Sequence, residues 1–167
     1  CTGQDTKRGP HQHPRLSMDG APVNQLLNLS AYAEQMLVHE HACVAIDPDM
    51  PLDRACVIGC AVTTGAGAVF NAADVTPGET VAIVGCGGVG LAAVNAAKIA
   101  GAGRIIAIDP VADKRALAEK LGATDCIDAS ADGAAEQVIE LTKGGVHHAI
   151  EAVGRPASAN MAVKVLR

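Results

Sequence analysis

A run of glycines carries the strongest chemical signal in the sequence. Gly85-Cys86-Gly87-Gly88-Val89-Gly90 stands between the apolar run 81–84 and the alanine-rich segment 89–100. In a strand–turn–helix unit, Gly85 would permit the tight turn, Gly87 a close backbone approach to a pyrophosphate, and Gly90 close packing of helix on strand. The N–H groups and the dipole at a helix start favour an anion there. The pattern predicts a dinucleotide site, and the alternative is a plain glycine turn with a capping Asp.

An acid at the end of the next apolar run fits the same kind of site. Asp109 closes the run 104–109 and follows Gly90 by about 20 residues, where the dinucleotide fingerprint places an acid on the ribose 2′-OH. A carboxylate accepts hydrogen bonds from a ribose hydroxyl and repels a 2′-phosphate, so NAD is predicted rather than NADP. Lys114 could reach the same ribose, or it could be a solvated side chain on a helix face.

Thiols and imidazoles offer weaker indications of a metal. Six Cys without paired spacing indicate reduced thiols, of which one could be a metal ligand, rather than a disulfide framework. Cys60 follows Cys56 by one helical turn in an apolar segment, so either metal ligation or burial as small hydrophobic residues is open. His39 and His41 would share one face of a strand, but no third ligand has a suitable spacing, and surface histidines are expected.

The elements that must position these residues follow a regular alternation from residue 76 onward. Apolar strands are predicted over 81–84, 104–109, 126–127 and 146–153, with helices over 89–100, 113–121 and 131–142 between them. Strands joined by helices require crossover connections, so the sheet is expected to be parallel and the fold class to be α/β.

The first part of the chain is organised differently. Residues 1–22 carry Gly and Pro without periodicity and predict a loop. Alternation over 31–46 predicts a strand, and 52–72 predicts a helix that its glycines weaken. The chain opens without Met and stops inside an apolar pattern, so both ends are expected to be cut from a longer protein.

Composition narrows the classes of partner. Acidic residues outnumber basic ones, 18 to 13, and the chain has one Tyr, one Phe and no Trp. A nucleic-acid-binding protein needs positive charge and often aromatic platforms, so no nucleic-acid partner is expected. The longest uncharged apolar stretch, 55–70, is shorter than the ~20 residues of a membrane span, so no membrane association is expected.

Taken together, these motifs resemble the zinc-containing medium-chain alcohol dehydrogenases. The resemblance runs in order from about residue 19 to the C-terminus. It is carried by the glycine run, the segment 104–109, Ile58-Gly59-Cys60, Thr63-Thr64-Gly65, Leu121-Gly122-Ala123-Thr124 and Glu151-Ala152-Val153-Gly154-Arg155.

The resemblance implies roles for individual positions. Cys60 would be a thiolate ligand of the catalytic zinc, and Thr64 would touch the nicotinamide. The backbone of Gly87, Gly88 and Val89 would face the pyrophosphate. Asp109 and Lys114 would hold the adenosine ribose, Val153 and Gly154 would lie at the nicotinamide side, and Arg155 would lie against the adenosine portion. Cys1 resembles the third or fourth ligand of a structural zinc lobe, although Gly9 stands near where the family has its fourth Cys.

The resemblance also implies an architecture and an activity. Residues 1–50 would be the remnant of a GroES-like catalytic domain, 51–75 a connecting helix with the zinc-ligand Cys60, and 76–167 a partial, four-stranded Rossmann domain. The whole enzyme would be a cytoplasmic homodimer or homotetramer that oxidises a small alcohol to an aldehyde or ketone with NAD and zinc. This chain alone is expected to be inactive.

Three alternatives stay open at this stage. One is a thiol-dependent formaldehyde dehydrogenase, which acts on an S-hydroxymethyl thiol. A second is a zinc-free quinone reductase of the same superfamily, which Cys60 and Asp109 disfavour. The third is a catalytically dead dinucleotide-binding protein.

Overall fold

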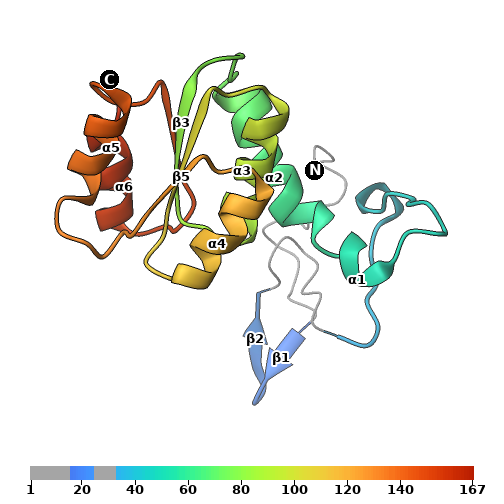
Figure 1. Ribbon diagram of the computed structural model, residues 1–167. Helices are drawn as coiled ribbons and strands as arrows, with labels where there is room; N and C mark the ends of the chain where they lie inside the picture. The colour runs from blue at the N-terminus through green and yellow to red at the C-terminus, as the bar shows by residue number, and fades with distance from the viewer. Residues whose placement is uncertain (1–15, 25–32) are drawn as a thin grey trace. The chain divides into compact units, whose positions relative to one another are not determined.

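The computed structural model describes residues 16–24 and 33–167 (Figure 1). The chain divides into two compact units, Cys1–Met50 and Pro51–Arg167, and each is described by itself.

The first unit contains a short hairpin where a loop was predicted. Strands β1 (Leu16–Met18) and β2 (Ala21–Val23) pair antiparallel. Asp19 and Gly20 form the turn with φ of 52° and 78°, and positive φ at both central positions is the geometry of a two-residue hairpin. The loop prediction over 1–22 was therefore wrong at residues 16–22, because Asp19-Gly20 is a strand-joining turn rather than a break between elements.

The strand predicted over 31–46 is also wrong within residues 33–46. This segment contains only the 3-10 turn η3 (Glu40–Ala42). His39 is the N-cap of that turn and His41 lies within it, so they do not share a strand face, and the His41 N–H donates to His39 Nδ1 at 3.2 Å. Nearly every residue here is exposed, so the alternation of side chains has no packed face to stabilise it.

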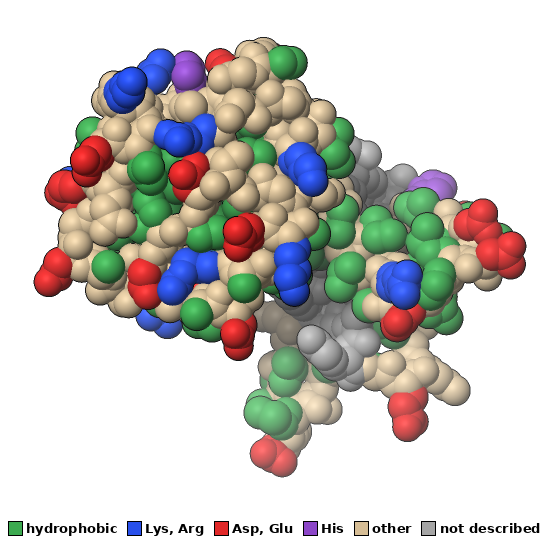
Figure 2. Space-filling view, in the orientation of Figure 1, with side chains coloured by type: hydrophobic (Ala, Val, Ile, Leu, Met, Phe, Trp, Pro, Cys, Tyr) green, Lys and Arg blue, Asp and Glu red, His purple; other side chains and the backbone are tan. Residues whose placement is uncertain are grey.

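The second unit begins with a helical run that is not one regular helix. It consists of α1 (Leu52–Ala55), α2 (Thr63–Gly67) and two π-helical stretches, η4 (Ile58–Val62) and η5 (Ala68–Ala72), on either side of α2. Its outer face is apolar, with Leu52 75% exposed, and hydrophobic side chains gather over it in Figure 2.

In the described part of the chain, this run passes a length-and-composition test for a membrane span. The run Leu52–Ala72 is 21 residues long, and its 18-residue apolar window has a mean hydropathy of 1.5, with 11% of that window buried. The run is longer than the uncharged stretch 55–70 partly because it also contains Asp53 and Arg54, and the expectation of no membrane association stays a prediction. Core helices of soluble proteins pass the same test, so this property alone assigns no membrane.

The remainder of the second unit is the predicted α/β fold. Its strands are β3 (Thr80–Val84), β4 (Arg104–Ile108), β5 (Asp125–Ile127) and β6 (His148–Glu151), in the order β5-β4-β3-β6 and all parallel. Helices α3 (Gly88–Ile99), α4 (Ala112–Leu121) and α5 (Ala134–Thr142) confirm the predicted alternation. A further helix, α6 (Pro156–Lys164), was not predicted; it begins with a proline, whose fixed φ suits a first helical position.

Helices cover the sheet on both faces (Figure 1). On one face, Val81 and Ile83 of β3 pack with Val94 of α3, and on the other, Val84 packs with Val138 of α5 and Val165. Aliphatic side chains and alanines build both cores, as the near absence of aromatic residues requires.

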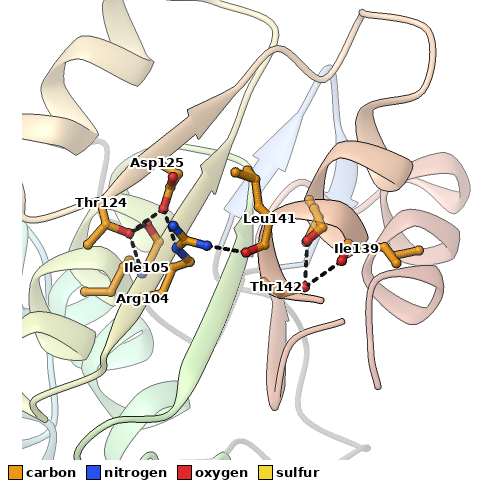
Figure 3. A network of polar contacts seen from close by, with 8 residues as sticks. Arg104, Ile105, Thr124, Asp125, Ile139, Leu141 and Thr142 are labelled. Carbon is orange, nitrogen blue, oxygen red and sulfur yellow. Dashed lines mark hydrogen bonds and ion pairs between the residues drawn. The ribbon is translucent and has the colours of Figure 1, made fainter. Parts of the chain in front are cut away.

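Polar contacts hold the amino ends of the strands. Arg104 Nε lies 3.1 Å from Asp125 Oδ2, and the same oxygen accepts a hydrogen bond from Thr124 Oγ1 at 2.7 Å. The Arg104 guanidinium also donates to the Leu141 carbonyl at the end of α5 (Figure 3). At the start of β6, His148 Nε2 lies 2.9 Å from Glu79 Oε2. These contacts stabilise the amino ends of the strands, and ligands of such sheets bind at the opposite, carboxyl ends.

Candidate functional site

A cleft opens at the carboxyl ends of the strands. It has a volume of about 690 Å³, which is within the usual range for small-molecule sites. It lies at the point where the strand order reverses. From β3 the chain adds β4 and β5 on one side, and it then crosses over to add β6 on the other side of β3. Open parallel sheets bind ligands at such a point. It is lined by residues at or after the ends of all four strands, by Lys114 of α4 and by the start of α6, among them Val84, Gly85, Gly87, Asp109, Lys114, Ser130, Val153, Arg155 and Ser158.

The glycine turn at the base of the cleft has the geometry that a pyrophosphate cradle needs. Gly85 has φ of 99°, and a Cβ there would lie 2.5 Å from Val153 Cγ2. A Cβ on buried Gly90 would overlap the carbonyl oxygen of Gly85, whereas a Cβ on Gly87 would meet nothing within 4 Å. Gly85 and Gly90 are therefore required by the protein's own packing, and Gly87 leaves open space toward the cleft.

The start of α3 adds a favourable field for an anion. Gly87 is the N-cap, and no side chain caps the helix, so the N–H groups of Gly88, Val89 and Gly90 lack the intrahelical partners that later residues have. Gly88, Val89 and Gly90 do not themselves line the cleft, while the exposed cations Lys114 and Arg155 do.

Asp109 lies in the same cleft and is 5% exposed. Its Oδ2 accepts the Cys86 N–H at 2.8 Å and its Oδ1 accepts the Val111 N–H at 2.9 Å. Each carboxylate oxygen can accept a second hydrogen bond, so these contacts orient the carboxylate and leave it able to bind a diol. The contact with Cys86 also ties the acid directly to the glycine turn.

Arg115 supports the Asp109 side of the cleft. Its guanidinium donates to the Asp109 carbonyl at 2.6 Å and lies 3.2 Å from Asp128 Oδ2. Asp128 in turn accepts from the N–H of Ser130 at 2.9 Å, and the Ser130 and Arg115 contacts lower the pKa of Asp128. Arg115 and Ser130 could not be predicted from the sequence, because no motif marks a contact between separate loops.

Glu151 is a further residue whose role no sequence motif indicates. It ends β6, and its Oε1 accepts the N–H groups of Val153 at 2.8 Å and Gly154 at 2.9 Å. The hydroxyl of Ser158 donates to the same oxygen at 2.7 Å. The Ser158 contact is the main cause of a lowered pKa for Glu151, with the two backbone N–H groups adding to it.

Cys60 and Thr64 do not line the cleft. Both are exposed on the helical run, which is held against α3 because Gly65 of α2 packs on Val89, Ala92 and Ala93. Cys60 lies in the π-helical stretch η4, a kind of distortion often found at functional sites. Its assignment as a zinc ligand, and that of Thr64 as a nicotinamide contact, stay predictions.

The described residues do not by themselves make a zinc site. Within residues 16–24 and 33–167, no three His, Cys, Asp or Glu side chains cluster as a metal site requires. Cys1 lies outside the described residues. Cys86 is buried, and burial raises the pKa of its thiol to about 12, so it is neither a ready ligand nor a nucleophile. The cleft therefore fits a dinucleotide. The Cys60 thiol alone does not make a zinc site, because zinc needs further protein ligands.

Comparison with known proteins agrees with this geometry. Residues 88–167 match the family of zinc-binding dehydrogenases. The chain is 42% identical over 142 residues to alcohol dehydrogenase 1 of Pisum sativum. This alignment covers 84% of this chain and 37% of the relative.

Two solved structures are similar over most of the chain. One is an alcohol dehydrogenase zinc-binding domain protein from Burkholderia ambifaria, at 38% identity and a TM-score of 0.79, covering 88% of this chain and 40% of that one. The other is benzyl alcohol dehydrogenase from Acinetobacter calcoaceticus, at 38% identity and a TM-score of 0.79, covering 84% and 39%.

The sheet order, the glycine turn and the cleft together define a Rossmann-type domain. The motif order and the matches then place the chain in the zinc-containing medium-chain alcohol dehydrogenase family. The chain spans between a third and a half of the length of these relatives, at 37% to 40%.

Proposed function

We propose that this chain is the cofactor-binding part of an NAD-dependent alcohol dehydrogenase. The observation that carries the proposal is the joining of the glycine turn to a buried acid, through the hydrogen bond from the Cys86 N–H to Asp109. The names of the relatives, which include alcohol dehydrogenase 1 and benzyl alcohol dehydrogenase, support alcohols as the substrate class.

The cleft offers a suitable group for each successive part of NAD, from the adenosine ribose to the nicotinamide. Asp109 would accept hydrogen bonds from the adenosine ribose, with Lys114 beside it, and the start of α3 would bind the pyrophosphate over Gly87. The nicotinamide half would then extend toward Val153 and Gly154 on the opposite side of β3. When bound, NAD supplies the hydride acceptor for oxidation of the alcohol carbon.

The choice of NAD over NADP rests on Asp109. Its carboxylate is oriented by two backbone N–H groups and is nearly fully buried. A 2′-phosphate placed there would face a fixed negative charge in a poorly solvated position. Lys114 and Arg155 also line the cleft, but both are exposed and flexible side chains, so solvent screens their attraction for a phosphate.

Zinc would be held by Cys60 together with ligands from the remainder of a longer protein. A catalytic zinc needs three protein ligands, and only Cys60 among the described residues matches the family pattern.

Two measurements test the proposal. The chain titrated with NAD and NADP should bind NAD at least tenfold more tightly, since a lost charge-assisted hydrogen bond costs about 1.5–3 kcal/mol. The protein extended to the length of its relatives should reduce NAD with a primary or secondary alcohol. NADP binding equal to or tighter than NAD binding, or an extended protein that binds NAD and oxidises no alcohol, would contradict the corresponding part of the proposal.

A further inference from the structure

We infer that Glu151 is a positioning residue that holds the Val153–Gly154 turn in the shape needed to bind the nicotinamide of the cofactor. This inference rests on the proposed function, because it names how one wall of the same cleft is made. It concerns a residue that does not line the cleft itself and so acts only through its neighbours.

The turn needs such a support because the sheet ends there. Ala152 still donates its N–H to the Val84 carbonyl at 2.8 Å, as the last link between this segment and β3. The next two N–H groups, of Val153 and Gly154, have no strand to pair with, and both donate to Glu151 Oε1. Gly154 also lies 3.2 Å from Oε2 and has φ of 79°, a conformation that glycine adopts readily.

The same carboxylate joins the turn to the following helix. Ser158, at the third position of α6, donates its hydroxyl to Glu151 Oε1 at 2.7 Å and also lines the cleft. One side chain therefore fixes the end of β6, the turn and the start of α6. The lowered pKa of Glu151 is consistent with these three donors stabilising its ionised form.

The position of the turn indicates which part of a dinucleotide it meets. Asp109 follows β4 on one side of β3, and Val153 follows β6 on the other. Val153 packs so closely on the glycine turn that a Cβ on Gly85 would lie 2.5 Å from its Cγ2. With the adenosine ribose at Asp109 and the pyrophosphate over the glycine turn, the half that reaches Val153 is the nicotinamide half.

The experiment compares NAD with ADP-ribose, which lacks only the nicotinamide. Calorimetric titrations of the purified chain would give both dissociation constants for the wild type, Glu151→Ala, Glu151→Gln and Asp109→Asn. Glu151→Ala leaves the N–H groups of Val153 and Gly154 without their acceptor, while the Ser158 hydroxyl can still donate to the Arg155 carbonyl at 2.8 Å. We expect this variant to weaken NAD binding about tenfold. ADP-ribose binding should stay within about twofold, which also shows that the variant is folded.

The other two variants complete the test. Glu151→Gln keeps an acceptor oxygen in place of Oε1, so it should restore most of the NAD affinity. Asp109→Asn should weaken both ligands, because both contain the adenosine ribose. Equal weakening of NAD and ADP-ribose by Glu151→Ala, or no weakening of either, would overturn the inference about Glu151 while leaving the cofactor site intact. A wild-type chain that binds neither ligand would overturn the proposed function, and this inference with it.

Discussion

Replacing Gly90 by Ala tests whether the glycine turn is built as described. Gly90 is buried at the start of α3, and an added Cβ would overlap the carbonyl oxygen of Gly85 and lie 2.9 Å from its carbonyl carbon. Both atoms belong to the backbone, so no rotamer change relieves the contact. The start of α3 must instead move away from β3.

The size of the effect follows from two opposing terms. Forcing an extra carbon into a packed region costs about 1–3 kcal/mol, and a backbone obstacle places Gly90→Ala at the upper end of that range. Alanine gains about 1 kcal/mol over glycine in a helix. We therefore expect Gly90→Ala to lower the free energy of unfolding by about 2 kcal/mol and to weaken NAD binding, because the displaced turn no longer presents the same N–H groups.

Gly87→Ala is the matched control two glycines earlier in the same turn. A Cβ at Gly87 meets nothing within 4 Å, and its backbone, with φ of −82° and ψ of −168°, is open to alanine. The small loss of an N-cap glycine and the reduced entropy of the unfolded chain roughly cancel. Stability should therefore change by less than about 0.5 kcal/mol, whereas NAD should bind about tenfold or more weakly because the Cβ occupies the approach of the pyrophosphate.

Urea unfolding followed by far-UV circular dichroism gives the stabilities, since the chain has no Trp to report fluorescence. NAD titration gives the affinities. We expect Gly90→Ala to lower the free energy of unfolding and Gly87→Ala to lower only the affinity for NAD. Unchanged stability in Gly90→Ala, or unchanged NAD affinity in Gly87→Ala, would refute it.

Three further predictions address the acid, the amino edge of the sheet and the metal. Asp109→Asn should lower NAD affinity about tenfold and narrow the difference between NAD and NADP, and an unchanged ratio in paired titrations would contradict the ribose assignment. The pKa of Glu79 is lowered from 4.5 to about 2, mainly by the Thr76 N–H and then by His148, so its contribution to stability is present above pH 4.5 and is lost as pH falls toward 2. Between about pH 2 and pH 4.5, the free energy of unfolding of Glu79→Gln should therefore change less with pH than that of the wild type. Identical pH profiles would exclude a stabilising role for the Glu79 carboxylate. In the protein extended to the length of its relatives, Cys60→Ser should lower zinc content and alcohol oxidation together while Cys56→Ser leaves both nearly intact; metal analysis with the opposite pattern would move the ligand role to Cys56.

The parallel sheet could be predicted because its signals are local. Each strand is a short apolar run, and Gly122, with φ of 128°, ends α4 where the sequence indicated. The glycine spacing likewise predicted the need for Gly90, because its packing depends on Gly85 in the same turn, whereas Gly85 is restricted by Val153 from a distant part of the chain. Helix α6 was missed because it follows β6 at the end of the chain, where no further strand marks the alternation.

The first unit and the details of the cleft depend on partners that a sequence pattern does not show. Alternation over 33–46 resembles a strand, but a strand needs a neighbour, and exposed residues there have no packed face. The same holds for the site. Asp109 was predicted as a ribose ligand, but its bond to the Cys86 N–H joins positions 23 residues apart, and Arg115 connects two different loops.

Amide chemical shifts of the isotopically labelled chain, recorded as NAD is added, test the central claim most directly. The account predicts that the largest changes fall at the carboxyl edge of the sheet, on Gly85 to Gly90, Asp109 and the Val153–Gly154 turn, and that His147 and His148 at the amino edge stay unchanged. Changes centred on the amino edge, or no saturable change at the glycine turn, would contradict it.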